Sequence, residues 1–231
     1  GFWKIVTGTL IEGKISIDDE MTIYPSEKKV KVRNLQVHGC DVKTAYAGQR
    51  TAINLSNIKV SEIQRGDVIA QTGSVEESMM IDVNISLVEH CKKSLKHWDR
   101  IRIFHGTKQI LCRIVPLNED EIQYGESGYA QLRLEEKIVA KKGDRFIIRS
   151  YSPMDTIGGG VIIDKTSKKH KIYDESVIEA LKIKEKGELK DILEEYLKLN
   201  LSNYITLKEL VSYTGEKEEY VKEGLNALID E

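Results

Sequence analysis

Residues 8–15 read GTLIEGKI, which is one residue short of a phosphate-binding P-loop. Such a loop needs the pattern G-x-x-x-x-G-K followed by Ser or Thr, whose hydroxyl binds Mg²⁺. Gly8, Gly13 and Lys14 have the required spacing, but Ile15 carries no hydroxyl. A P-loop also opens a helix, whereas the residues after Lys14 alternate apolar and polar as in a strand. We therefore interpret the stretch as a β-hairpin that turns at Gly13, and we expect no nucleotide there.

Cysteine and histidine could supply metal ligands. Cys40, Cys91 and Cys112 lie far apart, with His38 near the first and His90 beside the second. Because no C-x-x-C occurs and nothing completes a set of four ligands, we expect no metal site. Three cysteines without a paired pattern suit a reducing cytosol, so we expect a cytoplasmic protein.

Other catalytic patterns are weak or missing. The sequence DTIG at 155–158 matches the D-x-x-G of a GTPase switch, but two fixed letters arise often by chance, and no N-K-x-D accompanies them. The GGG at 158–160 precedes a strand, so we interpret it as a place of close backbone packing. There is no G-x-S-x-G and no H-E-x-x-H. The residues therefore predict no catalytic site and no cofactor within this chain.

Charge divides the chain into two parts. The 231 residues carry a formal net charge of −2, but residues 171–231 alone carry 9 Lys+Arg against 15 Asp+Glu. The preceding part is therefore net positive. No apolar run approaches the length of a membrane span, and no signal peptide is present. Since the chain starts with Gly inside a strand pattern, we expect it to be a segment of a longer protein.

Periodicity predicts a mainly β chain that ends in helices. Residues 1–77 and 78–164 each contain several short alternating strands at barrel-like spacing, with a bulge expected at Asn34. Residues 165–171, KTSKKHK, read as a polar linker. Residues 172–231 show helical periodicity and suggest a helix-turn-helix or a partial winged-helix domain.

The helical part carries clear capping signals. Thr206 followed by Glu209 forms a capping box before LKELVSYT, and Gly215 ends that helix. Candidate helices also cover ESVIEALKIKEK, ELKDILEEYLKLN and EKEEYVKEGLNALIDE. The last of these is rich in Glu, so we expect the helical part to repel a phosphate backbone rather than to bind it.

Long stretches resemble the selenocysteine-specific elongation factors. VTGTLIEGKISIDDEMTIYP, VKVRNLQVHG, AGQRTAINLSNI and IQRGDVIA are similar to their second domain. RIRIFHGT, YAQLRLEEKIVAKKGDRFIIR and RSYSPMDTIGGGVIID are similar to their third domain. The resemblance covers roughly residues 1–164. It implies two tandem translation-factor β-barrels, followed by the first C-terminal winged-helix unit.

The resemblance also implies a function. Such a factor carries selenocysteyl-tRNA to the ribosome at a recoded UGA codon, with GTP and Mg²⁺ bound in an upstream domain and an mRNA hairpin bound by downstream winged-helix units. Gln49 and Arg50 match the pocket for the aminoacylated tRNA end, where a guanidinium would favour a selenolate. Ser152 and Thr156 lie in the loop that matches the tRNA-backbone contact.

The sequence also allows other interpretations of these residues and of the chain. Arg50 could be a surface residue in an ion pair, and the loop at 152–160 could be purely structural. The chain could belong to a general translational GTPase that handles ordinary aminoacyl-tRNA, or it could be a structural adaptor. No membrane partner is expected under any of these interpretations.

Overall fold

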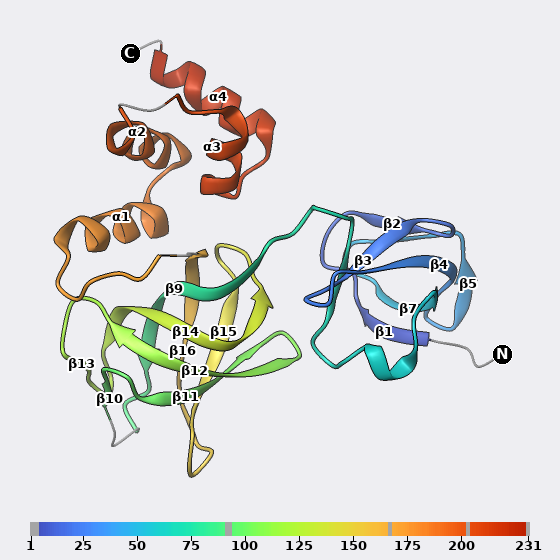
Figure 1. Cartoon of the computed structure of the whole chain (residues 1–231), viewed down its shortest axis with the longest axis horizontal. Helices are drawn as coiled ribbons and strands as arrows, with labels where there is room; N and C mark the ends of the chain where they lie inside the picture. The colour runs from blue at the N-terminus through green and yellow to red at the C-terminus, as the bar shows by residue number, and fades with distance from the viewer. Residues whose placement is uncertain (1–4, 91–93, 166–167, 202–203, 230–231) are drawn as a thin grey trace. The chain divides into compact units, whose positions relative to one another are not determined.

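The computed structural model describes residues 5–90, 94–165, 168–201 and 204–229. Contacts divide the chain into two compact units, Gly1–Glu77 with Lys137–Val139, and Ser78–Glu136 with Ala140–Glu231. The first unit consists of strands, and the second holds a closed barrel and four helices (Figure 1). This confirms the mainly β fold with a helical end. In the part of the chain that is described, no helix has both the length and the apolar character to span a membrane.

Eight short strands form the first unit. They are β1 (Ile5–Thr9), β2 (Lys14–Ser16), β3 (Glu20–Tyr24), β4 (Lys28–Val37), β5 (Cys40–Val42), β6 (Thr44–Tyr46), β7 (Arg50–Ser56) and β8 (Val68–Ala70), with one 3₁₀ turn, η1, at Val60–Glu62. The main sheet has the order β1-β7-β4-β3-β8, and β5 pairs with β4. β2 and β6 form a separate two-stranded ladder.

Both sheets of the first unit cover one apolar core. Ile15 of β2 and Ala45 of β6 are buried in the same cluster as Ile23, Val32 and Leu35 of the main sheet. The period of two explains this, because alternate side chains of each strand point to the same face. The register of β4 against β7 shifts between Val32 and Asn34, which confirms the expected bulge.

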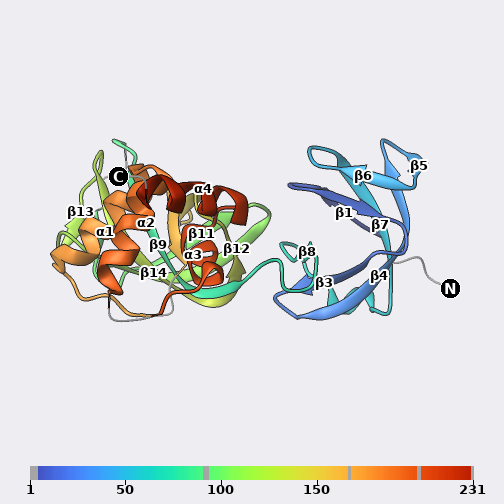
Figure 2. The ribbon, with the colours of Figure 1, turned by 90° about the horizontal axis from the view of Figure 1, so that it is seen from above.

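β1 and β2 do not pair with each other, so the hairpin expected for residues 8–15 is wrong. β1 pairs with β7 (Figure 2), and β2 pairs with β6. The backbone between β1 and β2 runs alongside the segment between β6 and β7. Leu10 N–H donates to the carbonyl of Gln49, and Ala47 N–H donates to the carbonyl of Gly13, each at 2.9 Å. The expected turn at Gly13 is present, with φ of 70°.

The second unit contains a closed barrel. Its strands run in the order β11-β12-β14-β9-β16-β15, and β10 and β13 form a separate two-stranded ladder. The bounds are β9 (Glu77–Leu87), β10 (Leu95–Lys96), β11 (Arg100–His105), β12 (Lys108–Pro116), β13 (Glu121–Ile122), β14 (Ser127–Val139), β15 (Arg145–Ser150) and β16 (Thr156–Lys165). Closure leaves these six strands without a free edge. Cys91 lies outside the described residues.

The triple glycine of β16 is a point of close packing. Gly158 and Gly160 lie opposite Leu87 and Ile85 of β9. A Cβ on Gly160 would meet the carbonyl oxygen of Asn84 and the ring of Phe146, and a Cβ on Gly158 would meet the backbone of β9. The structure therefore confirms that these glycines permit close backbone approach.

Four helices follow the barrel: α1 (Glu175–Lys186), α2 (Leu189–Leu199), α3 (Leu207–Thr214) and α4 (Glu218–Ile229). Thr206 and Glu209 form the expected capping box of α3, and Gly215 ends this helix with φ of 71°. α1 packs on the barrel through Leu181, and α2–α4 enclose a cluster of their own around Leu193, Leu210 and Val221. Residues 166–167 of the expected linker and residues 230–231 lie outside the described residues.

Lys184 connects the barrel to this helical cluster. The side chain is only 8 % exposed. Its ammonium group donates a hydrogen bond to the carboxylate of Asp164 in β16 and lies 3.5 Å from the ring centroid of Tyr213 in α3. Burial raises the pKa of Asp164, and the positive charge of Lys184 opposes that rise. The buried cation thus contacts the barrel and a helix of the separate cluster together.

Replacing Gly160 with Ala should destabilise the second unit by about 1–3 kcal/mol, because the new methyl group must displace backbone. The matched control is Gly8→Ala, whose Cβ would meet nothing within 4 Å. That change should stay within about 0.5 kcal/mol. Urea unfolding followed by circular dichroism measures both. Equal and small changes at the two positions would show that β16 does not need this glycine.

Candidate nucleic-acid interface

Five arginines gather on one part of the outer face of the second barrel. In the strand register Arg100 of β11 lies opposite Arg113 of β12, which lies opposite Arg133 of β14. On the next level Arg102 of β11 lies opposite Arg149 of β15. We call these five residues the arginine face. They come from four adjacent strands and far-apart stretches of sequence.

Alternation along each strand places these arginines outward. In β11 Ile101 and Ile103 are buried, while Arg100 and Arg102 are partly exposed. The same alternation holds in β12, where Arg113 lies between two buried residues. Because successive side chains of a strand point to opposite faces, filling the barrel with isoleucine forces the arginines to the outside.

Like charges directly opposite one another destabilise a strand pair. Arg100 has an ion-pair partner, since its Nε and Nη2 donate to the Glu135 carboxylate at 2.8 and 2.6 Å. This pairing lowers the pKa of Glu135. Among the described residues, the other four guanidinium groups have no carboxylate within 4.0 Å. The arginine face therefore retains an excess of positive charge that an anion would relieve.

Aromatic rings support the guanidinium groups. Arg100 and Arg102 lie 4.8 and 5.2 Å from the ring centroid of Tyr151. The Cζ atom of Arg149 lies 5.3 Å from the ring centroid of Phe104, and the Cζ atom of Arg133 lies 5.2 Å from the ring centroid of Trp98. Such cation–π contacts hold a guanidinium in place and leave its charge unneutralised. These arginines are therefore partly ordered before any ligand binds.

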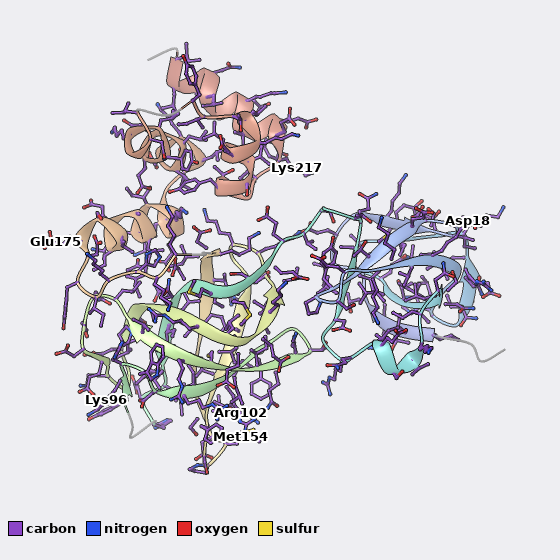
Figure 3. All side chains as sticks on the ribbon, in the orientation of Figure 1. Asp18, Lys96, Arg102, Met154, Glu175 and Lys217 are labelled. Atoms are coloured by element: carbon purple, nitrogen blue, oxygen red, sulfur yellow. The ribbon has the colours of Figure 1, made fainter. Side chains whose placement is uncertain are left out.

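The loop between β15 and β16 borders the arginine face. Ser152 is exposed in this loop, and Thr156 is exposed at the start of β16, where its hydroxyl accepts a hydrogen bond from Arg149 Nε at 3.0 Å. Tyr151, directly before Ser152, contacts the Arg102 guanidinium with its ring, and Figure 3 labels Arg102 and Met154 of this loop. The structure thus brings both predicted loop residues to the edge of the arginine face.

Gln49 and Arg50 belong to the first unit. The side-chain oxygen of Gln49 accepts the N–H of Tyr46 at 2.8 Å, so it stabilises the turn before β7. Arg50 is exposed at the start of β7, opposite Thr9. In the described part of the chain its guanidinium has no carboxylate partner, so the ion pair considered from the sequence is absent there.

Metal ligands do not gather within the described ranges, where no group of three or more His, Cys, Asp or Glu side chains could hold an ion. Cys40 is exposed and Cys112 is buried in the barrel. Burial raises the pKa of the Cys112 thiol well above its usual range, so it stays protonated. The Nε2 atom of His105 instead lies 2.9 Å from Asp144 Oδ2 in a partly buried pair.

Two family models cover most of the β region. Residues 4–70 match the Elongation factor Tu domain 2 family. Residues 82–169 match the beta-barrel domain of the selenocysteine-specific elongation factor. The second barrel is a beta-barrel domain of the selenocysteine-specific elongation factor family. The resemblance seen in the sequence is thereby confirmed.

Individual relatives agree with this assignment. The selenocysteine-specific elongation factor of Desulfomicrobium baculatum is 37 % identical over 169 residues, which is 73 % of this chain and 27 % of that protein. The factor of the same name from Methanocaldococcus jannaschii is 29 % identical, over 71 % of this chain and 39 % of that one. The chain thus spans about a quarter to two fifths of these relatives.

A solved structure has the same fold. The crystal structure of a bacterial selenocysteine-specific elongation factor aligns with a TM-score of 0.71 at 22 % identity, covering 92 % of this chain and 33 % of that one. The alignment extends beyond the barrels, since they alone make up a smaller share of the chain. It supports the order of barrels followed by helices.

Sequence reasoning missed the arginine face. The strings RIRIF, LCRIV and QLRLE each place an Arg between apolar residues, and this was the available signal. Each string alone indicates only an amphipathic strand. Their meeting depends on which strands pair and in which register, and short strands do not encode that locally.

The chain should not bind GTP through GTLIEGKI. Gly13 is followed by β2 rather than by a helix, and the Leu10 N–H is already bonded within the sheet. Calorimetry with GTP and Mg²⁺ should show no micromolar binding, and Lys14→Ala should change nothing. Binding that is lost in Lys14→Ala would contradict this interpretation.

Proposed function

We propose that this chain is the tRNA-binding part of a selenocysteine-specific elongation factor that delivers selenocysteyl-tRNA to the ribosome at recoded UGA codons. In this proposal the full-length protein is a cytoplasmic GTPase whose GTP and Mg²⁺ site lies in a domain upstream of these barrels. An mRNA hairpin is held by winged-helix units downstream. The family match supports the general assignment, and the arginine face supports the RNA-binding role.

The arginine face carries the proposal. Phosphate oxygens accept hydrogen bonds from guanidinium groups in a bidentate geometry, and neutralised phosphates release counterions. The face presents guanidinium groups on two levels of four neighbouring strands. In the described structure Glu135, bound by Arg100, is the one carboxylate paired with them. This arrangement suits a duplex RNA backbone, which is recognised by its shape and its phosphates.

The β15–β16 loop extends the same surface. The Thr156 hydroxyl accepts from Arg149, so its own hydrogen is free to donate to a phosphate oxygen. Ser152 offers a second exposed hydroxyl. Asp155 contributes no attraction for phosphate. We assign these two hydroxyls to positioning the backbone and the arginines to the affinity.

Arg50 suits the aminoacylated end of the tRNA. An exposed guanidinium without a carboxylate partner in the described structure can accept an anionic selenolate. Gln49 has its oxygen committed to Tyr46, so only its amide NH₂ can contact a ligand. In this proposal Gln49 shapes the turn, and Arg50 contacts the ligand.

Neutralising one arginine on each level should weaken RNA binding. Arg113→Gln and Arg149→Gln should each reduce the affinity of this chain for a short blunt-ended RNA duplex about tenfold, since a charge-assisted hydrogen bond contributes about 1.5 kcal/mol or more. The matched control is Lys198→Gln, an exposed cation paired with Glu194 on α2. Fluorescence anisotropy at fixed salt measures all three. Equal affinities for the three variants and the natural chain would remove the arginine face from the proposal.

Arg50→Ala, made in the full-length factor, should discriminate between two charged forms of one tRNA. Loss of a contact to selenolate should weaken selenocysteyl-tRNA by about 1.5–3 kcal/mol and leave seryl-tRNA on the same tRNA body nearly unchanged. Protection of each ester from hydrolysis reports the affinity. Equal losses for the two esters would show that Arg50 contacts the tRNA rather than selenium.

A further inference from the structure

Trp98 is a large apolar side chain left exposed beside the arginine face. It lies in the turn between β10 and β11 and is 45 % exposed. Its backbone has φ of 71°, a conformation that costs a bulky residue free energy. The backbone N–H of Trp98 donates to the backbone carbonyl of Ile114 at 2.8 Å, which fixes the turn against β12. An exposed indole in a strained and fixed turn needs an explanation other than core packing.

Two members of the arginine face hold Trp98. Arg113 Nη1 donates to the Trp98 carbonyl at 2.9 Å. The guanidinium carbon of Arg133 lies 5.2 Å from the indole centroid. His97 lies at 5.8 Å with its ring tilted by 37°, so it does not stack on the indole. The indole is therefore supported by a cation and remains accessible to a second flat group.

The charges around Trp98 favour an anionic ligand. Asp99 is the nearest carboxylate in sequence, and it already accepts the Lys96 N–H at 2.9 Å. Glu121 is paired with Lys96, and Glu135 is bound by Arg100. Glu135 also attracts Arg113 over a longer distance, but within the described residues neither Arg113 nor Arg133 has a carboxylate within 4.0 Å. A flat ligand that brings negative charge with it matches this surface.

We propose that Trp98, backed by Arg133, is a stacking site for an unpaired nucleobase of an RNA whose phosphates lie on the arginine face. Every nucleobase has a π-face, and stacking on an aromatic side chain is the usual way in which proteins hold an unstacked base. Bases inside a duplex are already stacked, so the site selects RNA that carries an unpaired nucleotide next to its helix. The inference rests on the proposed RNA-binding role of the arginine face.

The test uses the intrinsic fluorescence of the whole 231-residue chain. Trp3 and Trp98 are its two tryptophans, so Trp3→Phe leaves Trp98 as the sole indole reporter. The probes are a blunt RNA hairpin and the same hairpin with a short run of unpaired uridines at one end. The extended hairpin should quench Trp98 and bind more tightly, whereas the blunt hairpin should bind with little quenching.

Variants at position 98 separate stacking from a structural role. Trp98→Ala should reduce the affinity for the extended hairpin by about five- to a hundredfold, and Trp98→Phe should retain most of it. Both variants should bind the blunt hairpin within about twofold of the natural chain, since its phosphate contacts lie on the arginines.

Three outcomes would overturn the proposal. Equal losses for both hairpins in Trp98→Ala would mean that Trp98 only supports Arg113 and Arg133. Equal affinity of the natural chain for the two hairpins, with no quenching by the extended one, would mean that the indole binds no base. Absence of binding to either hairpin would overturn the arginine face as well, which distinguishes failure of the proposed function from failure of the stacking site.

Discussion

The register of four barrel strands is the constraint on which the candidate interface depends. Side chains alternate between the two faces of a strand, so a slip of one residue would exchange the inner and outer sets. Ile101, Ile103, Ile114 and Ile148 are at most 1 % exposed on the inner face. Their burial, with that of Leu132 in β14, fixes β11, β12, β14 and β15 in one register, and that register aligns the arginines on the opposite face. The core thus determines the geometry of the surface.

Aligning arginines in this way has a cost in stability. Arg113 lies between Arg100 and Arg133 on the neighbouring strands, directly opposite each of them. Glu135 neutralises Arg100. A sequence selected only for a stable barrel would alternate charges across these strands. Aromatic contacts offset part of the repulsion without removing the positive field. The simplest physical reason to keep such a surface is a polyanion that binds to it.

The helical end has the opposite electrostatic character. Residues 171–231 carry an excess of acidic side chains, and α4 presents Glu218, Glu219 and Glu223. Such a surface repels a phosphate backbone at the ionic strength of the cell. Lys184, buried between Asp164 and Tyr213, nevertheless connects α1 and α3 to the barrel. The acidic helices are therefore connected to the basic barrel through the buried ammonium group of Lys184, whose charge is balanced by Asp164.

Much of the local structure could be predicted from the sequence, because it depends on neighbours along the chain. The capping box at Thr206, the helix end at Gly215 and the bulge near Asn34 are examples. Strand pairing was harder to predict, because β1 pairs with β7, which lies some forty residues further along the chain, rather than with β2. The arginine face was missed for the same reason, since its members meet only after the barrel closes. Gln49 was predicted from the sequence as a residue of the tRNA-end pocket, and its bond to Tyr46, which stabilises the turn before β7, could not be seen there.

The most direct test of the account is the salt dependence of RNA binding by this chain. The affinity for a blunt RNA duplex should fall linearly with salt on logarithmic axes, with a slope of about −2 to −4 if three or four phosphates are neutralised. Anisotropy titrations at several salt concentrations give this slope. A slope near zero, or no binding even at low salt, would show that the arginine face does not hold an RNA backbone and would contradict the account.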